Sequence, residues 1–243
     1  MLPKLDVPLY EITLPLLNKK VKIRPFLVKE EKILLMAMET QDEDSVLLAI
    51  KQIVNNCCID EIDVDALPIL DLEYLFLQLR ARSIGEEINL QYKCNNDVKD
   101  EEGKEKKCGH IINLNFNALE IEPEKNEKHN KTIQLTDKLG IVMKYPNFNI
   151  VEKTKNLPEA EMVAKMITLC VDYIFDENEI YYSKDVEEQE LTDFIDSLTR
   201  EQFLKIQEFF DTIPKLKKEL DFKCTKCAYE EKVILEGIQS FFV

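Results

Sequence analysis

Residues 220–235, LDFKCTKCAYEEKVIL, hold the pattern on which the interpretation of the whole chain depends. Leu220 and Phe222 alternate with polar residues before Cys224, and a similar alternation resumes after Cys227. Alternation with a period of two is typical of a β-strand that has one buried face. The stretch therefore predicts a β-hairpin that carries a Cys-x-x-Cys pair at its tip.

A second place in the chain has the same local design. One strand pattern leads into Cys94, and another leads away from Cys108. The entries Tyr92-Lys93-Cys94 and Phe222-Lys223-Cys224 share the order aromatic residue, lysine, cysteine. Two hairpin tips that each offer two cysteines are the ingredients of a zinc ribbon.

These cysteines suit one tetrahedral metal ion. Zinc in structural sites takes four ligands, and thiolate sulfur binds it at about 2.3 Å. The sequence thus predicts a zinc site formed by Cys94, Cys108, Cys224 and Cys227. Four protein ligands leave no position for water, so the predicted role is structural rather than catalytic. Because the two pairs are far apart in the chain, the metal would join the C-terminal hairpin to the middle of the chain.

Two alternatives to this ligand set remain. The thirteen residues between Cys94 and Cys108 exceed the usual spacing of two to four. We interpret residues 95–107 (NNDVKDEEGKEKK) as a solvated loop inserted into the first hairpin tip, between Cys94 and Cys108, because nearly all of them are polar or charged. His110 or His129 could take the place of one cysteine. A redox role is disfavoured, because the C-terminal Cys-x-x-Cys leads into a strand pattern rather than a helix.

The hydrophobic pattern of the remaining chain predicts an α+β fold, with helices packed against short antiparallel hairpins. Cys57, Cys58 and Cys170 fall on or at the end of apolar helix faces and are interpreted as core residues. Hairpins are expected at residues 10–24 and 133–143. The predicted helices cover residues 29–39, 45–58, 71–83, 159–175, 186–197 and 199–213.

Three parts are expected from these elements. An N-terminal hairpin with helices occupies residues 1–85. A zinc-ribbon-like module combines residues 86–121 with residues 215–243. A hairpin and the C-terminal helices occupy residues 130–214, and this part could form one continuous domain with the first.

Composition argues against several classes of function. The 243 residues include 47 acidic and 32 basic side chains, a net charge of −15, whereas a duplex-binding protein needs a basic face. Neither a signal peptide nor an apolar run of about 20 residues is apparent, so no membrane partner is expected. Seven cysteines, two of them adjacent, suit a reducing cytosol. Only two histidines are available for a catalytic triad, and five glycines in the whole chain are too few for a glycine-rich phosphate loop. Neither enzymatic activity nor a small-molecule substrate is therefore expected.

Several motifs, in their order along the chain, resemble a known family. They are YEITLP at 10–15, VKIRPFLVKEE at 21–31, DLEYLFLQLRARS at 71–83, VMKYP at 142–146, FFDTIP at 209–214 and the C-terminal Cys-x-x-Cys. In this order they resemble the baseplate hub proteins of T-even-like tailed phages, over most of the chain. The family is not regarded as enzymatic, so no catalytic residue carries over.

The resemblance implies a role in building the central hub of a contractile-tail baseplate through binding to other baseplate or hub proteins. It places the protein in the host cytoplasm during assembly, or in the baseplate of the virion tail. A hub component and an assembly chaperone that leaves before maturation are both compatible with the sequence. A zinc-ribbon regulator that binds nucleic acid is a further alternative.

Overall fold

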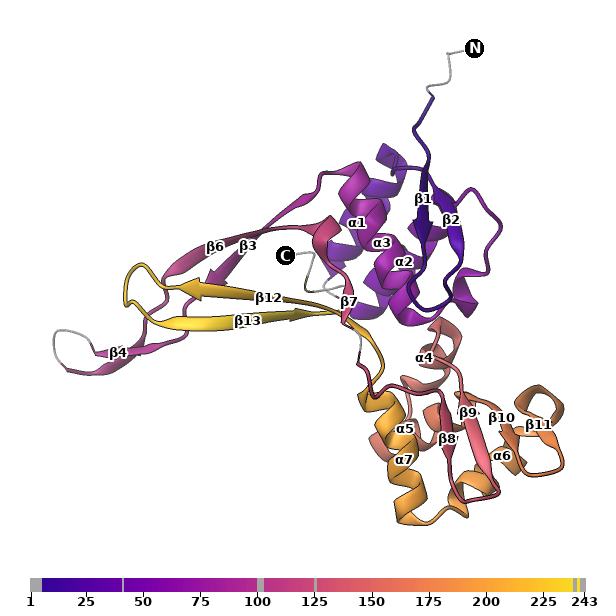
Figure 1. Cartoon of the computed structure of the whole chain (residues 1–243). Helices are drawn as coiled ribbons and strands as arrows, with labels where there is room; N and C mark the ends of the chain where they lie inside the picture. Colours follow the sequence, from indigo (N-terminus) through magenta and orange to yellow (C-terminus); the bar gives the residue numbers. More distant parts are fainter. Residues whose placement is uncertain (1–5, 41, 100–102, 125, 238–239, 241–243) are drawn as a thin grey trace. The chain divides into compact units, whose positions relative to one another are not determined.

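The chain folds as two compact units with mixed helices and antiparallel sheets, which confirms the α+β class (Figure 1). The computed structural model describes residues 6–40, 42–99, 103–124, 126–237 and 240. Unit 1 combines three segments of the chain, Met1–Ile62, Glu73–Glu124 and Lys215–Val243. Unit 2 consists of Asp63–Leu72 and Lys125–Pro214.

Unit 1 begins with a hairpin and helices. Strands β1 (Tyr10–Thr13) and β2 (Lys20–Ile23) pair antiparallel, as the alternating pattern predicts. The helices are α1 (Val28–Thr40), α2 (Glu43–Cys57) and α3 (Ile69–Ser83), the last of which starts in the part of the chain counted with unit 2. Their inward faces carry large aliphatic and aromatic side chains that are almost completely buried, among them Leu34, Ile50, Ile53, Leu75, Phe76 and Leu79.

A buried ion pair fixes the start of α1. The Glu30 side chain is fully buried, and its Oε1 lies 3.0 Å from Nη2 of Arg24. The main-chain N–H of Leu27 donates to its other oxygen at 2.9 Å. Arg24 also donates to the carbonyl of Asn56 in α2 at 2.8 Å. The pair therefore joins the end of β2 to both α1 and α2.

The rest of unit 1 consists of long hairpins. Strand β3 (Glu87–Lys93) pairs with β6 (Ile111–Asn117), and residues 217–223 of β12 (Lys215–Lys223) pair with the whole of β13 (Glu230–Glu236) (Figure 1). Strand β12 also pairs with the short β7, through Lys215 opposite Glu124. The remaining elements are β4 (Asp97–Lys99), β5 (Glu105–Lys107), the 3-10 helix η2 (Ala118–Glu120) and β7 (Pro123–Glu124).

Unit 2 is built around a four-stranded antiparallel sheet in the order β11-β10-β9-β8. Its strands are β8 (Thr132–Gln134), β9 (Gly140–Met143), β10 (Val171–Phe175) and β11 (Ile180–Tyr182). Its helices are α4 (Phe148–Thr154), α5 (Glu159–Leu169), α6 (Glu188–Asp196) and α7 (Arg200–Asp211), with 3-10 turns η1 (Val64–Ala66) and η3 (Ser183–Asp185). Residues from the sheet and from these helices share one core, including Ile141, Val171, Ile174, Leu191, Ile206 and Phe209.

One predicted helix was wrong in its last third. The helix expected over residues 159–175 ends at Leu169, and Val171–Phe175 instead forms β10 in the middle of the sheet. Its sequence VDYIF is rich in β-branched and aromatic residues, which favour strands. Pairing with β9 on one side and β11 on the other satisfies the strand's main chain. The apolar spacing that suggested a helix is compatible with both structures, so tertiary pairing decided the outcome.

Other local predictions hold. Thr199 and Gln202 form the predicted capping box at the start of α7, and that helix ends before Pro214. Cys57 and Cys170 are buried core residues, whereas Cys58 is partly exposed. Strand β11 and helix α4 were not anticipated. Within the described part of the chain, no helix combines the length and the apolar character needed to cross a membrane.

Candidate metal centre

The four candidate ligands lie at the ends of two hairpins of unit 1. In the first hairpin, Lys93 of β3 pairs with Ile111 of β6, and the cysteines follow at the tip side of this last pair. In the second, Lys223 of β12 pairs with Glu230 of β13 in the same position. The alternation of polar and apolar residues thus produces two ladders that end next to cysteines.

The first tip has a tight turn held by main-chain hydrogen bonds. The N–H of Cys94 donates to the carbonyl of His110 at 2.9 Å, and the N–H of Gly109 donates back to the carbonyl of Cys94 at 2.9 Å. Gly109 has a φ of 66°, in the left-handed region that glycine adopts without strain. The turn brings Cys94 and Cys108 together despite their distance in sequence.

The second tip repeats this arrangement. The N–H of Cys224 donates to the carbonyl of Tyr229 at 2.8 Å, and the N–H of Ala228 donates to the carbonyl of Cys224 at 2.9 Å. Ala228 has a φ of 59° and occupies the position that Gly109 has in the first tip. The likeness of the two tips therefore extends from their sequences to their main-chain hydrogen bonds.

The matched positions lead to a paired prediction. Gly109→Ala should destabilise its tip by about 1 kcal/mol, since a left-handed conformation is costly for alanine. An added methyl would meet only ordinary contacts there, the nearest being Cε of Lys93 at 3.6 Å, so the effect is conformational. Ala228→Gly should stabilise the other tip by about 0.5 kcal/mol, because relief of strain exceeds the added chain entropy. Urea unfolding of both variants measures the change in the free energy of unfolding. If both variants change it in the same direction, this explanation is wrong.

The insertion in the first tip is a small hairpin rather than the loop expected. Strands β4 and β5 pair from Asp97 opposite Lys107 to Lys99 opposite Glu105. The N–H of Cys108 donates to the carbonyl of Asn96 at 2.8 Å, which closes the base of this hairpin. Most of its side chains are exposed, as the charged composition predicted. Residues 100–102 lie outside the described part of the chain.

The four sulfur atoms converge on one point. Sγ of Cys94 lies 3.8 Å from Sγ of Cys227, and Sγ of Cys108 lies 3.8 Å from Sγ of Cys224. All four ligand atoms lie within 4.8 Å of one another. A tetrahedron with a centre-to-corner distance of about 2.3 Å has edges of about 3.8 Å, so the spacing fits zinc–thiolate geometry.

The main chain points hydrogen-bond donors at these sulfurs. Asn96, His110 and Tyr229 each direct a main-chain N–H to the cysteine two positions earlier. The bond from Tyr229 is the largest contribution that lowers the pKa of Cys227 to about 6. Sequence analysis did not identify this role of Asn96, His110 and Tyr229, because main-chain donors leave no signature in residue type.

The pKa values of two other thiols, Cys94 and Cys108, are shifted in the opposite direction. At Cys94 the N–H of Asn96 lowers the thiol pKa, but burial and the neighbouring sulfurs outweigh it and raise that pKa to about 12. Four thiolates so close together would repel one another. A divalent cation at their centre would supply the compensating charge, so this donor set fits a metal ion.

Side-chain contacts hold the two hairpins against each other near the sulfurs. The rings of Tyr92 and Phe222 have centroids 4.9 Å apart, and the Tyr92 hydroxyl donates to Glu231 at 3.3 Å. Nε2 of His110 lies 2.8 Å from Oγ1 of Thr225. All three contacts join the middle of the chain to its C-terminal hairpin.

No histidine joins the cluster among the described residues. His110 bonds Thr225 instead, and His129 lies in unit 2 between Thr212 and Tyr145, each 3.0 Å from one ring nitrogen. The other three cysteines, Cys57, Cys58 and Cys170, are not part of the cluster either.

Comparisons with known proteins place this chain among phage proteins. A family model described as T4 bacteriophage base plate protein matches residues 7–243. The chain is 24% identical, over 225 residues, to the baseplate hub assembly protein gp26 of Enterobacteria phage T4, and the match covers 93% of each chain. No solved structure matches.

Proposed function

The chain belongs to the T4 bacteriophage base plate protein family, and from this membership we propose that it helps to assemble the baseplate hub of a contractile-tail phage. The family match confirms the resemblance inferred from the order of the sequence motifs. The observation that supports a role in the hub, rather than elsewhere in the baseplate, is the similarity to a hub assembly protein over nearly the full length of both chains. The proposed mode of action is binding to other baseplate proteins, without catalysis.

Apolar side chains on the surface support a protein-binding role. Val28, Leu35 and Met36 of α1 are between 54% and 68% exposed. Exposed apolar residues that recur on one helix are typical of contact surfaces, and methionine adapts well to different partners. The net charge of −15 favours basic partner surfaces over nucleic acid.

In this proposal the four cysteines hold a structural zinc ion. Cys94, Cys108, Cys224 and Cys227 would be the ligands, within a zinc-ribbon-like module of residues 86–121 and 215–243. The metal would supply a cross-link between two hairpins whose main chains already form matching turns. A rigid pair of hairpins offers a fixed surface for another subunit. The convergence of four sulfurs supports this assignment.

The similarity to a hub assembly protein of phage T4 favours a transient assembly factor over a permanent component. The protein would then act in the host cytoplasm and leave before the virion matures. Mass spectrometry of purified virions separates the two roles, because a permanent component stays at a fixed number of copies per tail. Absence from virions that carry complete hubs would support the assembly factor.

A phage in which this gene carries a stop codon tests the assembly role. We expect infected cells to accumulate baseplate parts that lack a complete hub, and the protein supplied from a plasmid to restore tails. Affinity purification of the plasmid-borne protein, followed by cross-linking, should then identify hub proteins as direct contacts. Normal numbers of infectious particles without the protein would contradict the proposal.

A further inference from the structure

Strand β11 is an edge strand with an unusual surface. It lies at one end of the sheet of unit 2, next to β10 (Figure 1). All three of its residues are large and exposed: Ile180 by 53%, Tyr181 by 41% and Tyr182 by 44%. Edge strands in natural proteins are usually kept short or protected by charges or prolines, because their free main-chain groups can pair with another chain. β11 is short, but none of its three residues is charged or a proline. An apolar edge of this kind marks a place for a partner.

The register shows which main-chain groups are open. The N–H of Asp176 donates to the carbonyl of Glu179 at the turn, so hydrogen-bonded pairs follow at every second residue. Ile174 and Tyr181 are therefore the next bonded pair. The N–H and C=O of Ile180 and the N–H of Tyr182 therefore point away from β10, to the open side of the strand. The C=O of Tyr182 accepts the first hydrogen bond of the 3-10 turn η3, which starts at the next residue.

The opposite edge of the same sheet is different. In β8 the corresponding outward carbonyl, that of Gln134, accepts a hydrogen bond from Nζ of Lys205 at 3.3 Å. Thr132 and Gln134 also present polar side chains to solvent. In the part of the chain that the structure describes, no side chain bonds the outward groups of Ile180 or Tyr182. The two edges of one sheet thus differ in protection.

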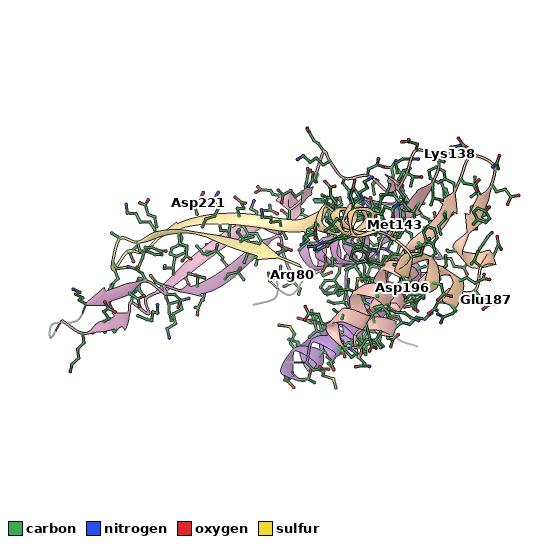
Figure 2. The ribbon with its side chains drawn as sticks, turned by 90° about the horizontal axis from the view of Figure 1, so that it is seen from below. Arg80, Lys138, Met143, Glu187, Asp196 and Asp221 are labelled. Atoms are coloured by element: carbon green, nitrogen blue, oxygen red, sulfur yellow. The ribbon has the colours of Figure 1, made fainter. Side chains whose placement is uncertain are left out.

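The chain segment around β11 is strongly acidic, although two of its carboxylates are paired with lysines outside it, Glu177 with Lys138 and Glu188 with Lys165. Residues 172–196 include ten acidic residues and a single basic one, Lys184, so this segment carries −9 of the total charge of −15. Glu187 and Asp196, at the two ends of α6, are labelled in Figure 2. The ten are Asp172, Asp176, Glu177, Glu179, Asp185, Glu187, Glu188, Glu190, Asp193 and Asp196. A basic segment is attracted to this surface, whereas a second copy of the same acidic surface is repelled.

We propose that β11 receives an extended, lysine- or arginine-rich segment of another protein as an additional strand of the sheet. The N–H and C=O of Ile180 and the N–H of Tyr182 would bond the incoming strand, and the exposed apolar side chains would contact its alternate residues. The acidic residues would select basic side chains beside them. This inference rests on the proposed binding to other baseplate proteins and specifies the chemistry of one partner.

A synthetic peptide tests the proposal on the full-length protein. The probe is an acetylated and amidated decapeptide of alternating lysine and valine, and its control has glutamate in place of lysine. We expect only the lysine peptide to bind and to slow amide exchange at Ile180 and Tyr182. Raising the salt to 1 M, where the Debye length is about 3 Å, should weaken binding severalfold.

Two variants of Tyr182 separate the contribution of its main-chain N–H to peptide binding from that of its side chain. Tyr182 has a φ of −74°, which proline adopts, and its N–H points outward, so Tyr182→Pro removes a donor to the partner without breaking the ladder to β10. Tyr182→Ala removes the same ring but keeps the N–H. We expect the proline variant to bind the peptide about tenfold more weakly than the alanine variant. Charge reversal by Glu179→Lys with Asp185→Lys should also weaken binding.

Several results would overturn this inference. Equal affinities of the proline and alanine variants would exclude pairing through the edge, and binding of the glutamate peptide would exclude selection by charge. Dimerisation in sedimentation experiments that Tyr182→Pro abolishes would assign the edge to a second copy of the chain. Complementation distinguishes strand addition at β11 from the role in hub assembly. If the Tyr182→Pro protein still restores tails, strand addition at β11 is contradicted, whereas the assembly role is not.

Discussion

Replacing Cys224 and Cys227 together by serine is expected to abolish zinc binding, from about one zinc per chain to none. The double variant removes half of the sulfur ligands, and a serine hydroxyl does not ionise to replace a thiolate. Structural zinc sites contribute roughly 10–16 kcal/mol of binding free energy at pH 7 in zinc-finger peptides, so this is the largest effect we expect. Elemental analysis of the dialysed protein measures the metal directly.

The structural consequence should be confined to the hairpins of unit 1. Without the metal, the two tips keep the side-chain contacts of Tyr92 and His110 but lose the proposed cross-link through the metal, so amide exchange should accelerate in β3, β6, β12 and β13. Helices α4–α7 belong to unit 2, which contributes no ligand, so their exchange should stay as in the parent protein. Exchange measured by mass spectrometry on peptides from both units resolves this difference.

Cys58→Ser provides the matched control. Cys58 is partly exposed and lies outside the sulfur cluster, so this variant should retain its zinc. If the double variant keeps one zinc per chain, the assignment of ligands is wrong. If the parent protein purifies without metal, and its hairpins remain protected when zinc is added to saturation or removed by a chelator, the four cysteines have another role.

Glu30→Gln is expected to destabilise unit 1 by about 3 kcal/mol. Removing one partner of a buried ion pair leaves the other charge without compensation, which typically costs about 3–5 kcal/mol. The lower end applies because Arg24 keeps the carbonyls of Pro25 and Asn56 as acceptors. Denaturation by urea, followed through amide exchange in α1 and α2, measures the loss. Glu31→Gln, at the exposed neighbouring position, should change stability by less than about 0.5 kcal/mol.

The same pair has a defined pH dependence. Burial raises the pKa of Glu30, but hydrogen bonds from Arg24, Leu27 and Lys29 outweigh it and hold that pKa below its ordinary value. A carboxyl whose pKa is lower in the folded state stabilises the fold above its unfolded pKa, about 4.3, and loses this contribution as the pH falls through the folded pKa. The stability difference between the parent and Glu30→Gln should thus be full at pH 7 and shrink below about pH 4. A difference that grows in acid would contradict this assignment.

Local patterns were enough to predict most of the elements of this fold. Strands with one buried face appear as alternation, so the hairpins that end at Cys94 and Cys224 were visible from residue types alone. The capping box at Thr199 was predictable for the same reason, because its partners lie three residues apart. The repeated aromatic-Lys-Cys entry pointed to two similar tips before their main-chain bonds were known.

Contacts between segments that are distant in sequence decided the features that local patterns did not predict. Residues 171–175 became β10 because β9 and β11 satisfy its main chain on both sides, although its apolar spacing also suits a helix. The pairing of Asp97 with Lys107 turned a charged spacer into a hairpin, which charge composition alone does not predict. Residue types indicated four candidate sulfur ligands, but only folding brought their atoms within 4.8 Å, since no local rule relates positions more than a hundred residues apart. Short-range periodicity therefore specified the elements, and long-range pairing specified where the elements meet.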